Sequence, residues 1–374
     1  MIYLASVVFL FTFLLCLLLT KSYYISFIVS VLKTFFFSLF FLLYFQHHLT
    51  DDLKYYEEAL SLINSYNNYN DFFSFYFELS ELLKTNHTLF FLYSAASIAI
   101  INEGYYSIVL MNIFLSCVST YLYAKVFTHL FVSGDKGFKF FFCLLALHPT
   151  LITWSSVIAL KEVLVLLLSG GYFYLTIIII RSKATWERLF YLIIIFFILY
   201  LMLDLRFYLV FIFLAATYFG FSKYKLKGWN LLYLLLIAGI AIFISLSFIP
   251  RAENAFSLFL KNFSNPLLGL PRFLLTPLPF SIEFDYSFIL FDSILHWLSF
   301  PLILVGFTIF LLDAKSKEVL FFTSFFFALI LVYSMFETLQ GPRHRVQIYP
   351  LFLFFQIKGV VWIAKSLGFV RAFK

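Results

Sequence analysis

A cluster of acidic residues follows a long, almost uncharged beginning of the chain. Asp51-Asp52 and Glu57-Glu58 lie within a short stretch, although the 374 residues include only 19 Asp and Glu. A charge at the centre of a bilayer costs on the order of 3 kcal/mol, so we expect these carboxylates in a loop or a wet cavity. Two interpretations stay open. The stretch is either the solvated end of a membrane helix or an acid/base pair in which Asp51 or Asp52 is catalytic.

Further ionisable residues lie at the ends of apolar runs, where they are functional candidates in a membrane protein. With Glu57, they form the candidate substrate-binding set: Lys161, Glu162, Asp204, Arg206, Tyr208, Arg272, Arg343, His344 and Arg345. The planar guanidinium of Arg pairs bidentately with phosphate, and a carboxylate can accept a hydroxyl proton. The mixture suits transfer of a sugar from a lipid-linked phosphate to an acceptor. Each group also has a plain interpretation, as a helix-end pair, a wet turn or an interfacial anchor.

Other chemistries find less support in the sequence. It has no Walker-type glycine loop and no GxSxG elbow, and its seven histidines form no HExxH motif. His47-His48 beside Asp51 could bind a divalent cation, which is an alternative to a metal-free site. Cys16, Cys117 and Cys143 all lie in apolar runs, so we interpret them as small core residues and not as a disulfide or metal set.

The composition defines the class of protein that must position these residues. The chain is 63% hydrophobic and only 12% charged, against about 25% charged in soluble domains. It is therefore expected to be a polytopic membrane protein. The net charge of +7 needs no nucleic-acid partner, because cytoplasmic loops are rich in Lys and Arg. The low count of 13 Gly argues against close helix crossings at small residues. The first apolar run has no basic start and no cleavage site, so we expect a retained helix.

Apolar runs of roughly 17–25 residues can cross a bilayer as helices. The candidate runs are 2–20, 24–46, 88–102, 105–125, 139–158, 162–180, 188–203, 205–222, 229–249, 290–312, 318–337 and 348–368. We therefore predict an all-α, polytopic transmembrane helical bundle of about 11–13 spans, forming a single integral membrane domain over 1–374.

Two connections are too long to be simple turns. The first, 47–87, is expected to carry helices that lie on the membrane surface. The second, 250–289, contains Pro266, Pro271, Pro277 and Pro279, which we expect to stop regular helix. Long loops of this kind are often functional.

The distribution of Lys and Arg predicts the orientation. In the second half it places loops 181–188 and 223–227 in the cytoplasm, so 161–162, 204–206, 250–289 and 337–347 are external. The first half conflicts with this. Counting back from the basic loop 125–139 through two clean spans puts Asp51 in the cytoplasm. The conflict disappears if either 88–102 or 139–158 is not a simple span, and the sequence does not choose between them.

The order of several short motifs resembles a known family. They are Asp51-Asp52 with Tyr55, Tyr56 and Ala59, His148-Pro149 to Ser156 with Lys161-Glu162, Leu205 to Tyr208, Pro277 to Phe280, and Pro342 to Val346 with Pro350. From about residue 50 to about residue 365, the chain resembles the polytopic bacterial glycosyltransferases of the GT-C type and related membrane proteins of surface-polysaccharide assembly. Wzy-type O-antigen polymerases are similar in size and in their external arginines. The chain departs from the family in having two apolar runs before the acidic loop.

The resemblance implies a GT-C-like fold in the bacterial cytoplasmic (inner) membrane, with the active site facing outward. It implies a polyprenyl-phosphate- or polyprenyl-diphosphate-linked sugar donor, a glycan or lipid acceptor, and other polysaccharide-assembly proteins as partners. Asp51 or Asp52 would be the catalytic acid, Lys161-Glu162 would occupy the position of a second acidic group, and Arg206, Arg343 and Arg345 would bind the lipid phosphate. A flippase for a lipid-linked oligosaccharide and a non-catalytic membrane partner are the alternatives. The nearly charge-free helix centres, with Lys33 as the exception, favour an enzyme over a flippase.

Overall fold

The computed structural model is mainly helical in the part of the chain that it describes. This part comprises residues 2–43, 50–66, 87–131, 134–182, 184–222, 261, 263, 265–282, 284–312 and 316–368. The remaining described residues form turns, bends and short irregular links, with one isolated β-bridge between Phe263 and Phe336. Seven described helices are long and apolar enough to cross a membrane, or eight if a bent pair counts as one span. The predicted all-α, polytopic helical bundle is confirmed.

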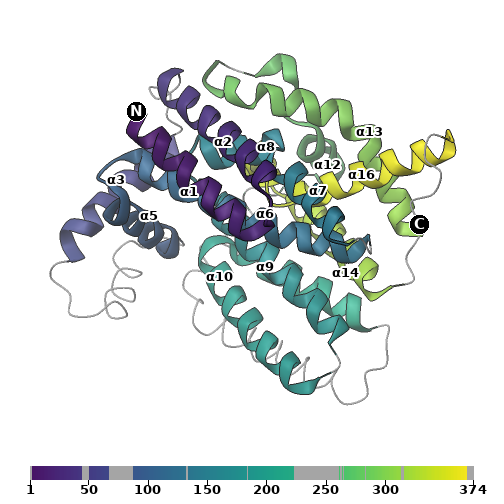
Figure 1. Cartoon of the computed structure of the whole chain (residues 1–374). Coiled ribbons are helices and arrows are strands. Elements are labelled where there is room, and N and C mark those ends of the chain that lie inside the picture. The colour runs from purple at the N-terminus through teal and green to yellow at the C-terminus, as the bar shows by residue number, and fades with distance from the viewer. Residues whose placement is uncertain are drawn as a thin grey trace. The chain divides into compact units, whose positions relative to one another are not determined.

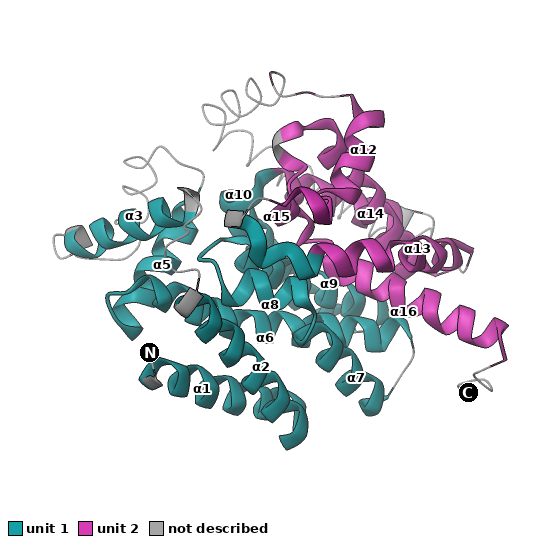
Figure 2. Cartoon of the chain, turned by 90° about the horizontal axis from the view of Figure 1, so that it is seen from above, with its two compact units in different colours: residues 1–207, 283–292 teal, residues 208–282, 293–374 magenta. Residues whose placement is uncertain are grey.

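The chain divides into two compact units, drawn in two colours in Figure 2. Unit 1 comprises 1–207 and 283–292, and unit 2 comprises 208–282 and 293–374. The helices are labelled in Figure 1. Those that begin in unit 1 are α1 (Ile2–Thr20), α2 (Tyr23–Leu43), α3 (Thr50–Tyr66), α5 (Thr88–Ile101), α6 (Tyr105–Leu130), α7 (Asp135–Ala146), α8 (Pro149–Ser156), α9 (Glu162–Arg181), α10 (Thr185–Ser222), the 3-10 helix η2 (Phe284–Ile289) and α13 (Leu290–Leu312). Those of unit 2 are α12 (Pro266–Leu275), η1 (Pro279–Ser281), α14 (Lys317–Met335), η3 (Glu337–Leu339), α15 (Pro342–Arg345) and α16 (Tyr349–Ser366).

Helix α6 is the centre of unit 1, where it packs against α1, α5, α7, α8 and α9. Helices α6 and α9 run in the same direction. Near their starts, the hydroxyl of Tyr105 accepts a hydrogen bond from the Ala159 backbone N–H at 2.9 Å. At their ends, Arg181 Nη2 donates to the carbonyl of His129 at 3.0 Å. The chain between them must therefore return along the bundle, and α7 and α8 make that return with a bend of 56°.

Helix α5 does not traverse unit 1. Its first turn lies beside α10, because Leu89 N–H donates to Asp204 Oδ2 at 2.7 Å. Its last residue, Ile101, lies just before the start of α6. Both ends of α5 thus belong to the end of unit 1 at which α6 and α9 begin. Its 14 residues span about 21 Å at ~1.5 Å per residue, less than the ~30 Å hydrocarbon core.

The structure interrupts or joins several of the apolar runs that the sequence analysis predicted as spans. Run 139–158 is the bent pair α7 and α8. Runs 188–203 and 205–222 form α10, whose helical backbone breaks at Arg206 (φ −155°, ψ 74°). Run 229–249 lies outside the described residues, as does most of the first long connection. In that connection Asp51-Asp52 and Glu57-Glu58 lie on α3, which packs against α5, with Leu62 on Phe91.

Two expectations about unit 2 were wrong. Prolines do not prevent helix at 266–275, because α12 begins with Pro266 in its first turn and includes Pro271. The Asn265 side chain caps this helix by accepting from Leu267 N–H at 2.9 Å, and a proline in the first turn removes no helical hydrogen bond.

Scarce glycine also does not exclude close helix crossings in unit 2. A Cβ on Gly306 of α13 would lie 1.8 Å from the carbonyl oxygen of Phe355 in α16. A Cβ on Gly359 of α16 would lie 2.4 Å from the carbonyl oxygen of Leu302. Two glycines at the right positions are enough, whatever the total count, because the approach is set locally at the crossing point.

Candidate functional site

A buried ion pair joins the start of α9 to the break in α10 within unit 1. Arg206 Nη2 lies 2.5 Å from Glu162 Oε1, and the two side chains are 9% and 2% exposed. The second oxygen, Oε2, is buried without a hydrogen-bond partner among the residues that the structure describes. Glu162 lies in the first turn of α9, where the helix dipole stabilises a carboxylate. The non-helical backbone at Arg206 places the guanidinium where α10 is interrupted.

The N-terminus of α5 gathers three more ionisable residues beside this pair. Asp204, two residues before Arg206, accepts from Leu89 N–H in the first turn of α5. A carboxylate from another helix thus satisfies one of the backbone donors that this turn leaves without an intrahelical partner. The residue before α5, His87, contacts Lys161 through its ring, with Lys161 Nζ 2.5 Å from Nε2. Lys161 directly precedes Glu162 and is also buried.

Asp52 joins the same region through a tyrosine. Asp52, only 2% exposed, accepts a hydrogen bond from the Tyr105 hydroxyl at 2.5 Å. That hydroxyl in turn accepts from Ala159 N–H, three residues before Glu162. The other Asp52 oxygen accepts from Leu53 N–H at 2.9 Å. Asn112 of α6 fixes the segment that connects α8 to α9. Its side-chain amide donates to the carbonyls of Ile158 and Leu160, each at 3.3 Å.

These contacts form one buried polar cluster at one end of unit 1, here called the unit 1 cluster. Its members come from α3, α6, the turn before α5, the start of α9 and α10: Asp52, His87, Tyr105, Lys161, Glu162, Asp204 and Arg206. The opposite end of unit 1 carries the basic residues Lys125, Lys139 and Arg181 near the ends of α6 and α9 and the start of α7.

Five of the predicted site residues thus meet in the unit 1 cluster, and the others lie elsewhere. Glu57 is exposed on α3. Tyr208, Arg272, Arg343, His344 and Arg345 belong to unit 2. The positions of His47 and His48, and the side chain of Asp51, fall outside what the structure describes. Among the described residues, no three His, Cys, Asp or Glu are grouped as a metal site would require.

The sequence analysis missed two members of the unit 1 cluster, His87 and Tyr105. His87 gave a signal, since it is a lone imidazole directly before an apolar run. Tyr105 gave none, because it is one of 25 tyrosines and only its contact with Asp52 distinguishes it.

Unit 2 contains a separate polar group around the end of α12. The carbonyl of Leu274 accepts from Arg345 Nη1 at 3.0 Å and lies 2.7 Å from His296 Nε2. Both side chains are buried. Tyr208 and Tyr333 place their hydroxyls 3.2 Å apart, and Tyr333 donates to Gln347 Oε1 at 2.5 Å. Arg272 instead forms an exposed pair with Glu337, at 2.9 Å.

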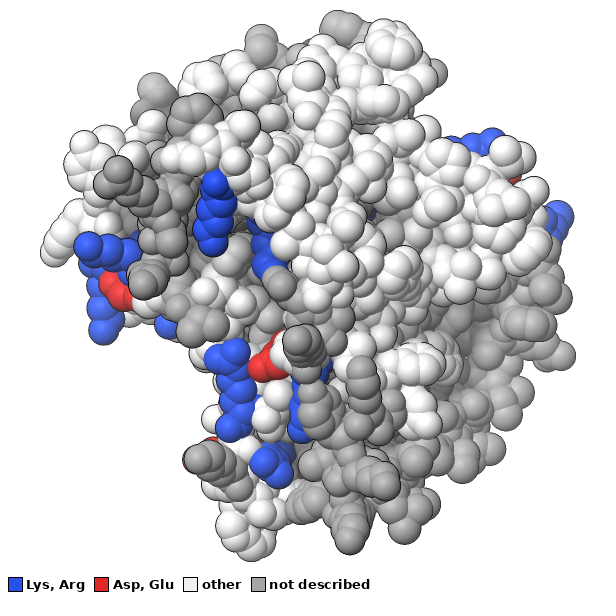
Figure 3. Space-filling view, turned by 90° about the vertical axis from the view of Figure 1, so that its right-hand side faces the viewer, with Lys and Arg blue, Asp and Glu red and all other residues white. Residues whose placement is uncertain are grey.

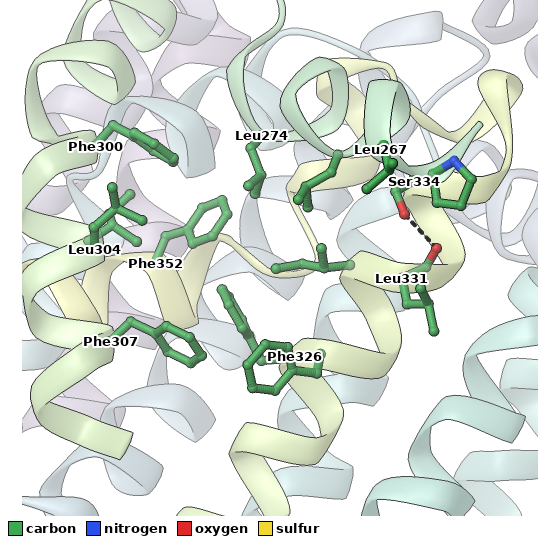
Figure 4. Close-up of a pocket in the computed structure, with 14 residues that line it drawn as sticks. Leu267, Leu274, Phe300, Leu304, Phe307, Phe326, Leu331, Ser334 and Phe352 are labelled. Atoms are coloured by element: carbon green, nitrogen blue, oxygen red, sulfur yellow. Dashed lines mark hydrogen bonds between the residues drawn. The ribbon is translucent and has the colours of Figure 1, made fainter. Parts of the chain in front are cut away.

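An apolar pocket of about 370 Å³ opens beside Leu274 in unit 2. Figure 4 shows rings and aliphatic side chains of α12, α13, α14 and α16 turned toward it. Its one polar lining residue, Ser334, donates its hydroxyl proton to the carbonyl of Leu331 at 2.8 Å. The walls therefore offer contacts to hydrocarbon and few to a polar ligand.

The outer surface agrees with a membrane environment. On the face drawn in Figure 3, Lys, Arg, Asp and Glu gather in a few places, and most of the described surface carries none of them. Large apolar side chains are exposed, for example Leu18 on α1 and Phe197 on α10. Such surface is unfavourable in water and favourable against lipid.

The cluster combines groups that can bind an anion with groups that can accept a proton. Arg206 and Lys161 supply positive charge, and Glu162 offers a carboxylate oxygen without a partner among the described residues. No family model, no curated protein and no solved structure matches this chain. The chemistry of the unit 1 cluster therefore carries the functional argument.

Proposed function

We propose that this protein is a membrane glycosyltransferase that takes a sugar from a polyprenyl-phosphate- or polyprenyl-diphosphate-linked donor and transfers it to a glycan or lipid acceptor. The observation that carries the proposal is the unit 1 cluster. Burying ionisable side chains in a membrane protein is costly, so such groups mark functional sites by default. Here two cations and three carboxylates lie in one buried network.

In the proposed reaction, Arg206 and Lys161 bind the donor phosphate. A phosphate oxygen replaces Glu162 at the guanidinium, since Arg offers five N–H donors in a planar fork. The released Glu162 carboxylate accepts the proton of the acceptor hydroxyl. The hydroxyl oxygen bonds to the anomeric carbon while the bond from that carbon to the phosphate oxygen breaks. The phosphate leaves with the electron pair, stabilised by the two cations.

Asp52 has a different proposed part from the one its position in the sequence suggested. Its two oxygens accept from Tyr105 and from Leu53 N–H, whereas Glu162 keeps one oxygen without a described partner. We therefore assign the base to Glu162, and Asp52 fixes Tyr105 and the chain before α9. Asp51 stays a sequence-based prediction.

The proposed location is the bacterial cytoplasmic membrane with the cluster facing outward. Support comes from the basic residues near the ends of α6 and α9, since Lys and Arg favour the cytoplasmic side and the cluster lies at the opposite end of those helices. Other polysaccharide-assembly proteins would supply the donor. In the alternative function, a Wzy-type polymerase, the protein would transfer a longer saccharide by the same chemistry.

The test is complementation of a gene deletion in the host, with mass spectrometry of the polyprenyl-linked saccharides in lipid extracts. The deletion should accumulate a lipid-linked saccharide, and the wild-type gene should clear it. Glu162→Gln and Arg206→Met should each clear it at least about 100-fold more slowly, as expected for loss of a proton acceptor or a charge-stabilising group.

The controls separate catalysis from folding. Glu187→Gln makes the same change at the opposite end of unit 1 and should complement fully. The double variant Glu162→Gln/Arg206→Met removes both charges, so it should fold better than either single variant and still fail to complement. An unchanged lipid pool in the deletion strain, or full complementation by Glu162→Gln, would overturn the proposal.

A further inference from the structure

Two cysteines far apart in the sequence meet in the interior of unit 1. Cys16 of α1 and Cys117 of α6 have no exposed surface, and their sulfur atoms lie 3.8 Å apart. The third cysteine, Cys143 of α7, is half-buried. Apolar position alone explains each buried thiol as a core residue, but it does not explain why two of the three should touch.

A buried lysine lies beside this pair. Lys33 of α2 has no exposed surface, and its Nζ donates to Ser116 Oγ at 2.8 Å and to Ser155 Oγ at 3.2 Å. Ser116 directly precedes Cys117. No ion pair among the described residues includes Lys33, while both thiols interact with it electrostatically. A buried ammonium without a counter-charge is costly, and a thiolate is the group at this site that can provide one.

We propose that Cys16 and Cys117 are a peroxide-sensitive thiol pair that closes to an intramolecular disulfide, with Lys33 as the proton acceptor for Cys117. This function does not depend on the glycosyltransferase reaction. It assigns a modification site to three side chains that the unit 1 cluster does not use. Buried structural cysteines are usually inert, and the neighbouring lysine is what distinguishes this pair.

The chemistry balances with hydrogen peroxide as the oxidant. Cys117 gives its proton to the hydroxyl of the adjacent Ser116 while that hydroxyl gives its own proton to the neutral amine of Lys33, 2.8 Å away, and the thiolate attacks one peroxide oxygen. The O–O bond breaks, which leaves Cys117 as a sulfenic acid and releases hydroxide, and hydroxide takes the proton back from Lys33 to form water. The Cys16 sulfur then attacks the Cys117 sulfur, and the sulfenic hydroxyl leaves with the Cys16 proton as water. Two thiols and one peroxide yield one disulfide and two waters.

The geometry requires only a local adjustment. The sulfur atoms must approach from 3.8 Å to the ~2.05 Å of a disulfide bond. The bond would tie α1 to α6, the central helix of unit 1. Hydrogen peroxide is small and uncharged, so it is the class of oxidant that can reach a site with no exposed surface.

The experiment counts free thiols in the full-length protein in membranes after treatment with hydrogen peroxide. The protein is denatured and labelled with a maleimide that adds mass to each thiol. The reduced chain has three cysteines and should take three labels. The oxidised chain should take one, on Cys143. Cys143→Ser should lose both remaining labels together, without a disulfide-linked dimer on a non-reducing gel.

Lys33→Met tests the role of the amine. It should slow disulfide formation at least tenfold, whereas Lys54→Met, the same change at an exposed position of α3, should not. Oxidation of Lys33→Met at the wild-type rate, stepwise loss of single labels, or a disulfide between two chains overturns the proposal. If Lys33→Met does not fold, the rates at which peroxide removes the labels are compared within the wild-type protein. Loss of the Cys143 label as fast as loss of the Cys16 and Cys117 labels overturns the proposal.

Discussion

At the scale of single residues, the two carboxylates closest to the start of α9 differ in how they are held. Glu162 pairs one oxygen with Arg206 and keeps the other without a described partner. Asp52 is engaged at both oxygens. In the proposed reaction Glu162 leaves one described partner, Arg206, before it accepts a substrate proton, whereas Asp52 would have to leave two. The difference supports our proposal that Glu162 is the base and that Asp52 positions the chain before α9.

The first prediction concerns this positioning. Tyr105→Phe removes the hydroxyl that links Asp52 to Ala159 N–H, so two buried groups lose a hydrogen-bond partner. It should lower the free energy of unfolding by about 1–3 kcal/mol, measured by thermal denaturation in detergent. Tyr106→Phe alters the neighbouring, half-buried ring and should change stability by less than about 0.5 kcal/mol. Equal effects of the two substitutions would show that the Asp52 link contributes nothing.

At the scale of helices, the interruptions position the cluster. Helix α10 has 38 residues, which would span about 57 Å, nearly twice a ~30 Å hydrocarbon core. Its break at Arg206 places a guanidinium inside unit 1 instead of at a helix end. Helix α5, which is too short to cross, brings His87 and the backbone donor of Leu89 to the same place. The sequence analysis expected a wet turn as one interpretation of Asp204 to Arg206, whereas both residues are buried.

The second prediction concerns the crossing of α13 and α16 in unit 2. Gly306→Ala places a methyl group 1.8 Å from the Phe355 carbonyl oxygen, so the helices must separate. The expected loss of stability is about 1–3 kcal/mol, measured as a lower denaturation temperature. Gly134→Ala adds the same methyl group where nothing lies within 4 Å and should be close to neutral. A Gly306→Ala protein as stable as Gly134→Ala would mean that this crossing is looser than described.

At the scale of the whole molecule, the course of the chain through unit 1 bears on the orientation conflict. The count of spans placed Asp51 on the side opposite Glu162 when run 88–102 and run 139–158 both cross. Because α5 has both ends at one end of unit 1, that crossing is removed and α7 with α8 makes the return. Asp52 and Glu162 then lie at the same end, and the basic residues of the α6–α7 and α9–α10 connections lie at the other.

The third prediction tests this arrangement in cells. In a Cys143→Ser background, Glu57→Cys at an exposed position of α3 should react with a membrane-impermeant maleimide in intact cells, because the proposed orientation places α3 on the outer side. Lys136→Cys, in the first turn of α7, should react only after lysis. The reverse pattern would place the cluster in the cytoplasm, and labelling of both positions in intact cells would contradict the proposed membrane topology.

The sequence by itself determined the class of protein and most of the residues worth testing. Long apolar runs must be helices in lipid, and an ionisable residue within or at the end of such a run is conspicuous because charges are costly at the bilayer centre. Both signals are local, so they can be read along the chain without a structure. They identified Lys161-Glu162 and Asp204 to Arg206, and they marked Lys33 as an exception.

Only the tertiary structure decided which of these residues meet. Asp52 reaches Ala159 through Tyr105, His87 reaches Lys161, and Cys16 reaches Cys117, in each case across more than 70 positions of the chain. Such contacts depend on which helices cross, which stop short and where one is interrupted. Those outcomes follow from side-chain packing between distant segments, and no periodicity or spacing within a single segment encodes them.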